Sequence, residues 1–210
     1  MVLCMSDTTY KCGSRDYLAR ARMLLDEKAQ QALFYAAFEL RCGVEARLQE
    51  YLEVQEHLSK KRKEGWKIAE LANNLKRAFD DGDQIIAITM SDKETGESVS
   101  CYYTPVTASL KKKGQQLGNY LHPMKQHKPA EHEWWKDLRN LLEATYQELK
   151  LATTGTLLGP PLLSPQKTTK LNCELGYSPK GDEILKELGQ VGRLTQMSVK
   201  YFKTLPQVQQ

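Results

Sequence analysis

The spacing of apolar residues predicts two consecutive amphipathic helices near the start of the chain. From Ser14, which we expect to cap the first helix, apolar residues recur at helical spacing as far as about Asp26. A longer pattern runs from near Lys28 to about His57, and its middle, Ala32–Phe38, is apolar on nearly every side. Such a helix belongs in a protein interior. We therefore expect it to be the central helix of a bundle and to form an antiparallel hairpin with the first helix.

A β-hairpin is predicted to interrupt the helical pattern at residues 84–104. A third helix is expected over Trp66–Asp80, after which the apolar spacing changes from helical to alternating. Two alternating segments flank Glu94-Thr95-Gly96, which has the composition of a turn. Because an isolated hairpin is marginally stable in water, we expect this one to lean on the helices or on a partner.

The second half of the chain predicts two more helices, a linker and a small appendage. The helices are expected over Ser109–His122, ending at Pro123, and over His132–Ala152. Residues 153–169 are rich in glycine and proline and are interpreted as a linker. Residues 170–210 predict a strand, a helix and a second strand, over Leu171–Tyr177, Asp182–Leu188 and Met197–Phe202. So short a segment cannot build its own core, so it should dock on the bundle or on another chain.

These patterns together predict a mainly α protein. Residues 1–152 would form a bundle of four or five helices with the inserted hairpin, and residues 170–210 a small α/β C-terminal appendage.

Composition is that of an ordinary globular protein of 210 residues, with 40% hydrophobic and 27% charged residues and a formal net charge of +4. Its longest apolar run, Ala32–Phe38, is far short of the roughly 20 residues needed to span a bilayer. The first ten residues lack the basic start and apolar stretch of a secretory signal. The five cysteines include no CxxC pair, which favours free thiols in a reducing compartment. We expect a cytoplasmic protein with no membrane partner.

Two basic stretches raise the possibility of RNA binding. His57–Arg77 holds seven basic and two acidic residues, and Ser109–Lys136 holds six and two. Such stretches can hold phosphates by releasing condensed counterions, although either one alone is more often a solvated helix face. The RNA-binding candidates are Lys60, Lys61, Arg62, Lys63, Lys111, Lys112 and Lys113.

Known catalytic and metal-binding motifs are absent from the sequence. It has no glycine-rich phosphate loop, no GxSxG and no HExxH, and no local signature marks a Cys–His pair. His122, His127 and His132 recur every five residues across prolines, which does not place them on one helical face. We interpret them as capping or solvated residues and predict no metal or cofactor.

Two groups of side chains have both a structural and a functional interpretation. Trp134-Trp135 could stack on bases, but helical spacing puts Trp135 on the apolar stripe and favours core packing with Trp134 partly free. Charged residues flank the apolar stripe of the second helix, and we expect them to be solvated partners on the helix surface. The alternative is that they line a polar groove between helices. These residues are Glu39, Arg41, Glu45 and Arg47.

The first two predicted helices resemble those of the HEPN (higher eukaryotes and prokaryotes nucleotide-binding) family. The resemblance rests on the run Arg15-Asp16-Tyr17-Leu18-Ala19-Arg20-Ala21 and on Ala32-Leu33-Phe34-Tyr35-Ala36-Ala37-Phe38-Glu39-Leu40, continued by Arg41–Leu48. It covers Ser14–Glu56 well and Gln115–Ala152 loosely, and leaves out the hairpin and the tail.

The resemblance implies a helical bundle that pairs as a homodimer, in a phage-defence or toxin–antitoxin type of system. Active members are metal-independent ribonucleases with an Arg, a polar residue and a His four to six residues after the Arg in the last helix. Arg139 and Asn140 match the first half of this motif as catalytic candidates. Glu143-Ala144-Thr145-Tyr146 stands where the histidine would fall, so the match ends at Asn140.

Three hypotheses follow. The first is a non-catalytic HEPN-like module that binds a protein partner, through the hairpin or the C-terminal tail, or RNA. The second is a metal-independent endoribonuclease that uses Arg139, with an acid or base supplied by Tyr146, Thr145 or a histidine. The third is a structural subunit of a larger assembly, docked through the tail.

Overall fold

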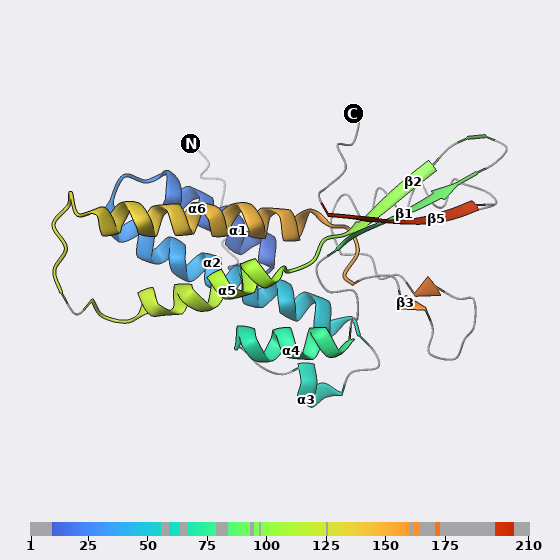
Figure 1. The fold of residues 1–210 in the computed structure, drawn as a ribbon, viewed down its shortest axis with the longest axis horizontal. Helices are drawn as coiled ribbons and strands as arrows, with labels where there is room; N and C mark the ends of the chain where they lie inside the picture. The colour runs from blue at the N-terminus through green and yellow to red at the C-terminus, as the bar shows by residue number, and fades with distance from the viewer. Residues whose placement is uncertain are drawn as a thin grey trace, which may run out of the picture.

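The computed structural model describes residues 10–55, 59–63, 67–78, 84–92, 95–96, 98–124, 126–159, 162–163, 171–172 and 196–203. It is mainly helical, as predicted, with a small three-stranded antiparallel sheet (Figure 1). Helices lie beside one another in one part of the molecule, and the sheet extends from their end. The helices are α1 (Ser14–Asp26), α2 (Gln30–Glu53), α3 (Lys60–Lys63), α4 (Ile68–Ala78), α5 (Ala108–Leu117), the 3-10 turn η1 (Gly118–Leu121) and α6 (Glu133–Thr154).

Helix α2 is the central helix, as its apolar middle predicts. It packs against α1, α4, α5, η1 and α6. Its inward residues, among them Leu40, Val44 and Leu48, are fully buried. Gly43 permits close approach, because a side-chain carbon there would lie 2.7 Å from Leu149 Cδ2 and 3.2 Å from Tyr17 Cβ. None of the described helices is long and apolar enough to cross a membrane.

The start of α1 differs from the sequence prediction by one residue. Gly13, not Ser14, is the N-cap, and its backbone N–H donates to Asp16 Oδ2 at 3.1 Å. Ser14 is the first helical residue and is buried, with both its backbone N and its Oγ bonded to Glu50. The prediction was wrong because a tertiary acceptor occupies the serine hydroxyl.

The predicted hairpin forms, and a third strand joins it. Strands β1 (Ile85–Ser91) and β2 (Ser98–Tyr103) are antiparallel, and Gly96 has a φ of 74° in the turn between them. Strand β5 (Gln196–Phe202), close to the strand predicted near the C-terminus, pairs with the other edge of β1. The order is therefore β2-β1-β5, which places part of the predicted appendage on the hairpin. A separate pair is formed by β3 (Leu162–Leu163) and β4 (Leu171–Asn172), and the predicted helix at Asp182–Leu188 lies outside the described residues.

The first part of the predicted linker is packed. Thr153 and Thr154 belong to α6, and residues 155–159 run along the end of β2. Leu157 N–H donates to Tyr102 O at 2.9 Å, and Tyr102 N–H donates to Thr156 Oγ1 at 3.1 Å. Leu157 is also a member of the hydrophobic core. These residues therefore fasten the bundle to the sheet, while the wider division into bundle, linker and appendage stays a prediction.

Candidate functional site

Arg139, the predicted catalytic residue, holds the end of another helix. Its Nη1 donates to Leu25 O at 2.8 Å and its Nη2 to Glu27 O at 3.2 Å. These carbonyls lie at the C-terminal end of α1, where no helical N–H follows to satisfy them. The guanidinium thus acts as a cap, and Asn140 beside it is exposed.

Glu143 lies one turn after Arg139 on α6 and also binds α1. It falls within the stretch where a HEPN ribonuclease would place its histidine. Its two carboxylate oxygens accept from Arg22 Nη1 at 3.0 Å and from Nη2 at 3.2 Å. Together with Asp26, this carboxylate raises the pKa of the Arg22 guanidinium. Arg139 and Glu143 therefore both serve the contact between α1 and α6.

The histidine and tryptophan residues near the start of α6 follow the structural interpretation. His132 is the N-cap, and its Nδ1 accepts from Trp134 N–H at 3.1 Å. Phe34 packs against both indoles, with ring centroids 6.2 Å from Trp134 and 5.7 Å from Trp135. Trp134 also lines a hollow of about 370 Å³ with Met124, Gln126 and Lys128. No group of three or more metal-ligating side chains occurs in the part of the chain that the structure describes.

The RNA-binding candidates differ in exposure and in their partners within the chain. Lys63 Nζ donates to Glu53 O at 2.8 Å, and Lys113 Nζ lies 2.6 Å from Glu148 Oε1. Lys60 and Lys112 are exposed and Lys111 is half-buried. The side chains of Lys61 and Arg62 lie outside the described residues.

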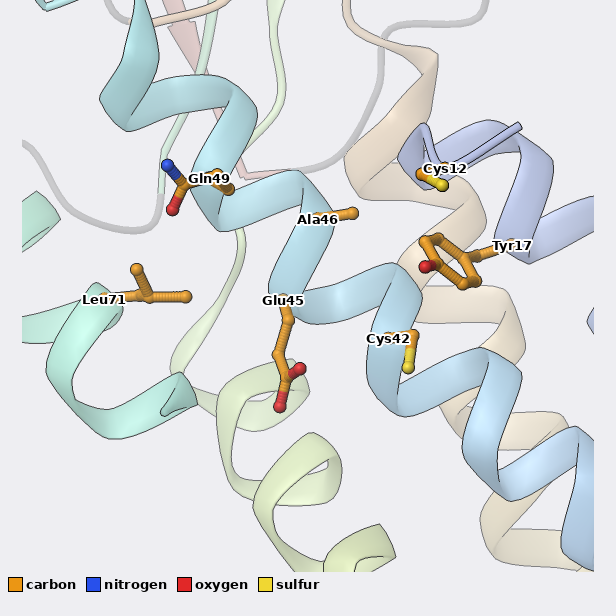
Figure 2. A pocket seen from close by; sticks show the side chains of 7 residues that line it. All are labelled: Cys12, Tyr17, Cys42, Glu45, Ala46, Gln49 and Leu71. Carbon is orange, nitrogen blue, oxygen red and sulfur yellow. The ribbon is translucent and has the colours of Figure 1, made fainter. Parts of the chain in front are cut away.

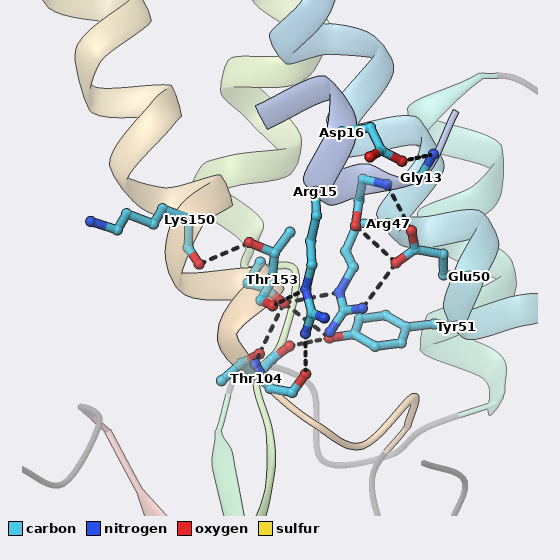
Figure 3. A network of polar contacts seen from close by, with 12 residues as sticks. Gly13, Arg15, Asp16, Arg47, Glu50, Tyr51, Thr104, Lys150 and Thr153 are labelled. Atoms are coloured by element: carbon cyan, nitrogen blue, oxygen red, sulfur yellow. Dashed lines mark hydrogen bonds and ion pairs between the residues drawn. The ribbon is translucent and has the colours of Figure 1, made fainter. Parts of the chain in front are cut away.

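A buried arginine lies at the centre of a polar network where α1, α2, α6 and β2 meet (Figure 3). Arg47 is 2% exposed, and its Nε donates to Ala152 O at 2.9 Å. Its Nη1 donates to Glu50 Oε2 at 2.9 Å, and the guanidinium carbon lies 4.3 Å from the centre of the Tyr51 ring. Its Nη2 is buried without a hydrogen-bond partner.

Other members of the network join the remaining elements to α2. The Tyr51 hydroxyl donates to Thr104 O, just after β2. Thr104 Oγ1 donates to Ala152 O at 2.9 Å and accepts from Gly155 N–H at 3.0 Å. A side-chain carbon at Gly155 would lie 2.5 Å from this hydroxyl, so the close approach requires glycine. The network is therefore the structural joint between bundle and sheet.

Sequence reasoning missed the burial of Arg47. It placed this residue among solvated charges. Arg41 and Glu45 do form the expected helical pair, with Nη2 and Oε1 3.0 Å apart, but both are half-buried. The available signal was spacing, because Arg47 follows Val44 by three residues and precedes Tyr51 by four, both on the buried face. Glu39 pairs instead with Arg20 of α1 at 2.9 Å.

A shallow hollow of about 210 Å³ lies on the outer face of α2, between α1 and α4 (Figure 2). It is lined by Cys12, Tyr17, Cys42, Glu45, Ala46, Gln49 and Leu71. Burial, followed by the charges of Glu45 and Glu39, raises the pKa of the Cys42 thiol to about 11. Burial also raises the pKa of Tyr17 to about 12 and, against the effect of Arg41, raises the pKa of Glu45.

Cys42 is therefore not an activated nucleophile. At neutral pH the Cys42 thiol is protonated, whereas a catalytic cysteine needs a lowered pKa. The lining combines apolar side chains with polar groups, of which Glu45 is paired with Arg41, and this suits a contact surface better than covalent chemistry.

The chain matches no known family model, and comparisons with characterised proteins and with solved structures find no significant relative. The resemblance to HEPN domains therefore stays a prediction that rests on the residues quoted above.

Proposed function

We propose that this protein is a non-catalytic, HEPN-like helical module that binds a partner protein and pairs as a homodimer. The non-catalytic part is supported by the contacts of α6. Arg139 caps α1, Glu143 binds Arg22, and His132 caps α6 itself. Arg139, Glu143 and His132 are thus engaged within the chain, whereas Asn140 is exposed.

Strand β5 carries the proposal of a protein partner. Among the described strands it lies at one edge of the sheet, where main-chain N–H and C=O groups can pair with an added strand. Val199 and Tyr201 are 38% and 54% exposed, and the register places them on the same face as Ile88 and Ile86. An extended segment of another protein that pairs with β5 could cover these side chains while continuing the sheet.

The test compares substitutions on the two faces of β5. Val199→Lys with Tyr201→Lys should abolish capture of a protein partner from extracts of the source cells. Lys200→Ala is the matched control, because Lys200 is exposed on the opposite face and should be dispensable. Circular dichroism and the thermal midpoint must show that both variants fold.

Treating the extract with ribonuclease separates a protein partner from RNA. A protein retained by the wild type and by Lys200→Ala after this treatment, and lost by the double variant, supports the proposal. Retention of RNA alone, weakened by Lys60→Glu or Lys112→Glu, would instead favour the RNA-binding hypothesis, because both lysines are exposed.

A further inference from the structure

The outer face of α2 carries an uncovered stripe of residues three or four positions apart. This α2 stripe consists of Gln31, Tyr35, Phe38, Cys42, Ala46, Gln49 and Glu53, all exposed or half-buried. Helix α1 flanks it on one side, and α4 flanks its second half on the other (Figure 2). Phe38 is 46% exposed, although burying so large an apolar side chain is favourable. The stripe thus has the character of a contact face.

The α2 stripe is arranged symmetrically about Cys42. Phe38 and Ala46 lie four residues before and after it, and Tyr35 and Gln49 lie seven residues before and after it. In a twofold dimer each contact occurs twice, between residue i of one copy and residue j of the other. A twofold axis through Cys42, perpendicular to α2, therefore places Phe38 over Ala46 of a second copy and Tyr35 over its Gln49.

These symmetric pairs are complementary in size. Phe38 is a large exposed side chain, and Ala46 is a small residue in the lining of the 210 Å³ hollow, near Tyr17 and Leu71. An apolar cavity of about 150 Å³ already accommodates a benzene molecule. The hollow beside Ala46 is thus large enough for a phenyl ring from a second copy.

The second pair is complementary in hydrogen bonding. Gln49 Nε2 donates to Glu53 Oε1 at 3.2 Å and to Lys63 O at 2.8 Å, which fixes the amide. Gln49 Oε1 is buried and has no hydrogen-bond partner in the single chain. The exposed phenol of Tyr35 would bring a donor to this residue, and pairing requires the buried Oε1 to turn outward on association, which relieves the cost of an unpaired acceptor.

Charges beside the stripe are balanced. Glu39 and Glu45 are again equidistant from Cys42, and each is paired with an arginine, at 2.9 Å to Arg20 and 3.0 Å to Arg41. A second copy therefore meets two neutral ion pairs near the axis, and the same symmetry places Glu53 over the uncharged Gln31, so no like charges face each other.

We propose that the α2 stripe is the homodimer interface, with the twofold axis at Cys42 and Phe38 of each copy seated in the hollow beside Ala46 of the other. The inference rests on the homodimer of the proposed function and names its surface. It is separate from the sheet edge, so variants of the two surfaces distinguish failure of one from failure of the other.

Light scattering on the full chain is the first test. The wild type should have the mass of a dimer, and Phe38→Asp should shift it to the mass of a monomer. Met23→Asp is the matched control, because Met23 is 70% exposed on α1 and is not part of the stripe. A monomeric wild type, or a dimer that survives Phe38→Asp, would overturn the proposal even if β5 still captured a partner.

An exchange of side chains tests the geometry itself. Phe38→Ala and Ala46→Phe should each weaken the dimer at least tenfold, the first by emptying the hollow and the second by overfilling it. In the double variant the ring at position 46 fills the hollow from its own chain and faces a small residue of the other copy, so the double variant should weaken the dimer by less than the two single variants added together. Additive weakening in the double variant would contradict the pairing about Cys42.

Cross-linking with a short bifunctional maleimide reports the axis and does not depend on destabilising variants, provided that the reaction is run at a raised pH and for long enough to offset the raised pKa of Cys42. The wild type and Cys12→Ser should give a covalent dimer, and Cys42→Ser should lose it. A cross-linked dimer that persists in Cys42→Ser would place the interface elsewhere.

Discussion

At the scale of single residues, charges that suggest chemistry serve the fold. Arg139 was expected to hold a phosphate, but both of its described hydrogen bonds go to carbonyls at the end of α1. Arg47 was expected at the surface and is buried in the joint between bundle and sheet. In each case the partner is more than 100 residues away in sequence, so local spacing could not identify it.

Arg139→Ala should therefore destabilise the protein. The variant loses two hydrogen bonds from a charged donor, and we expect the free energy of unfolding to fall by about 1–2 kcal/mol. Urea denaturation followed by circular dichroism measures this change, with exposed Asn140→Ala as the control that should leave it unaltered. Equal stability of the two variants would show that the cap contributes nothing.

Alkylation of Cys42 should depend on pH in a way that follows its raised pKa. Burial disfavours the thiolate, and the pKa of about 11 compares with about 8.5 for an ordinary cysteine. At pH 8 the folded thiol should react roughly a hundredfold more slowly than the same cysteine in urea, because only the thiolate attacks iodoacetamide. Peptide mass mapping gives both rates, and equal rates would contradict the burial of this thiol.

The same shift fixes the sign of its contribution to stability. The folded chain holds the Cys42 proton more tightly than the unfolded chain does. The stabilising contribution is thus complete below the ordinary pKa and is lost as pH rises toward about 11.

At the scale of elements, the helices could be predicted from the sequence and their connections to the sheet could not. The predicted first helix ends at Asp26 as α1 does and starts one residue late, and the predicted last helix ends two residues before α6 does. Apolar periodicity is local information, and it also located the hairpin. Two features join segments that are distant in sequence: the pairing of β5 with β1, and the packing of residues 155–159 against β2. The glycine and proline content of the predicted linker gave no sign that residues 155–159 are packed.

Leu157→Ala tests whether this segment belongs to the core. Leu157 is fully buried beside β2, so we expect a loss of about 3 kcal/mol in the free energy of unfolding. Leu158, which is only half-buried, is the matched control, and Leu158→Ala should cost clearly less. A flexible linker would instead tolerate both substitutions equally, and denaturant titration distinguishes the two results.

At the scale of the whole molecule, a helical bundle and a small sheet meet at one buried polar joint. The bundle presents the α2 stripe, and the sheet presents the edge strand β5. These two surfaces lie on different elements, so self-association and partner binding can take place on the same molecule. The residues around the incomplete catalytic motif are meanwhile used to hold α1 against α6.

The most direct test of a non-catalytic module is incubation of the purified protein with total RNA in EDTA, beside Arg139→Ala at a temperature where both are folded. Our account predicts intact RNA with both proteins. Cleavage by the wild type that is lost in folded Arg139→Ala would contradict it and would establish Arg139 as part of a metal-independent ribonuclease.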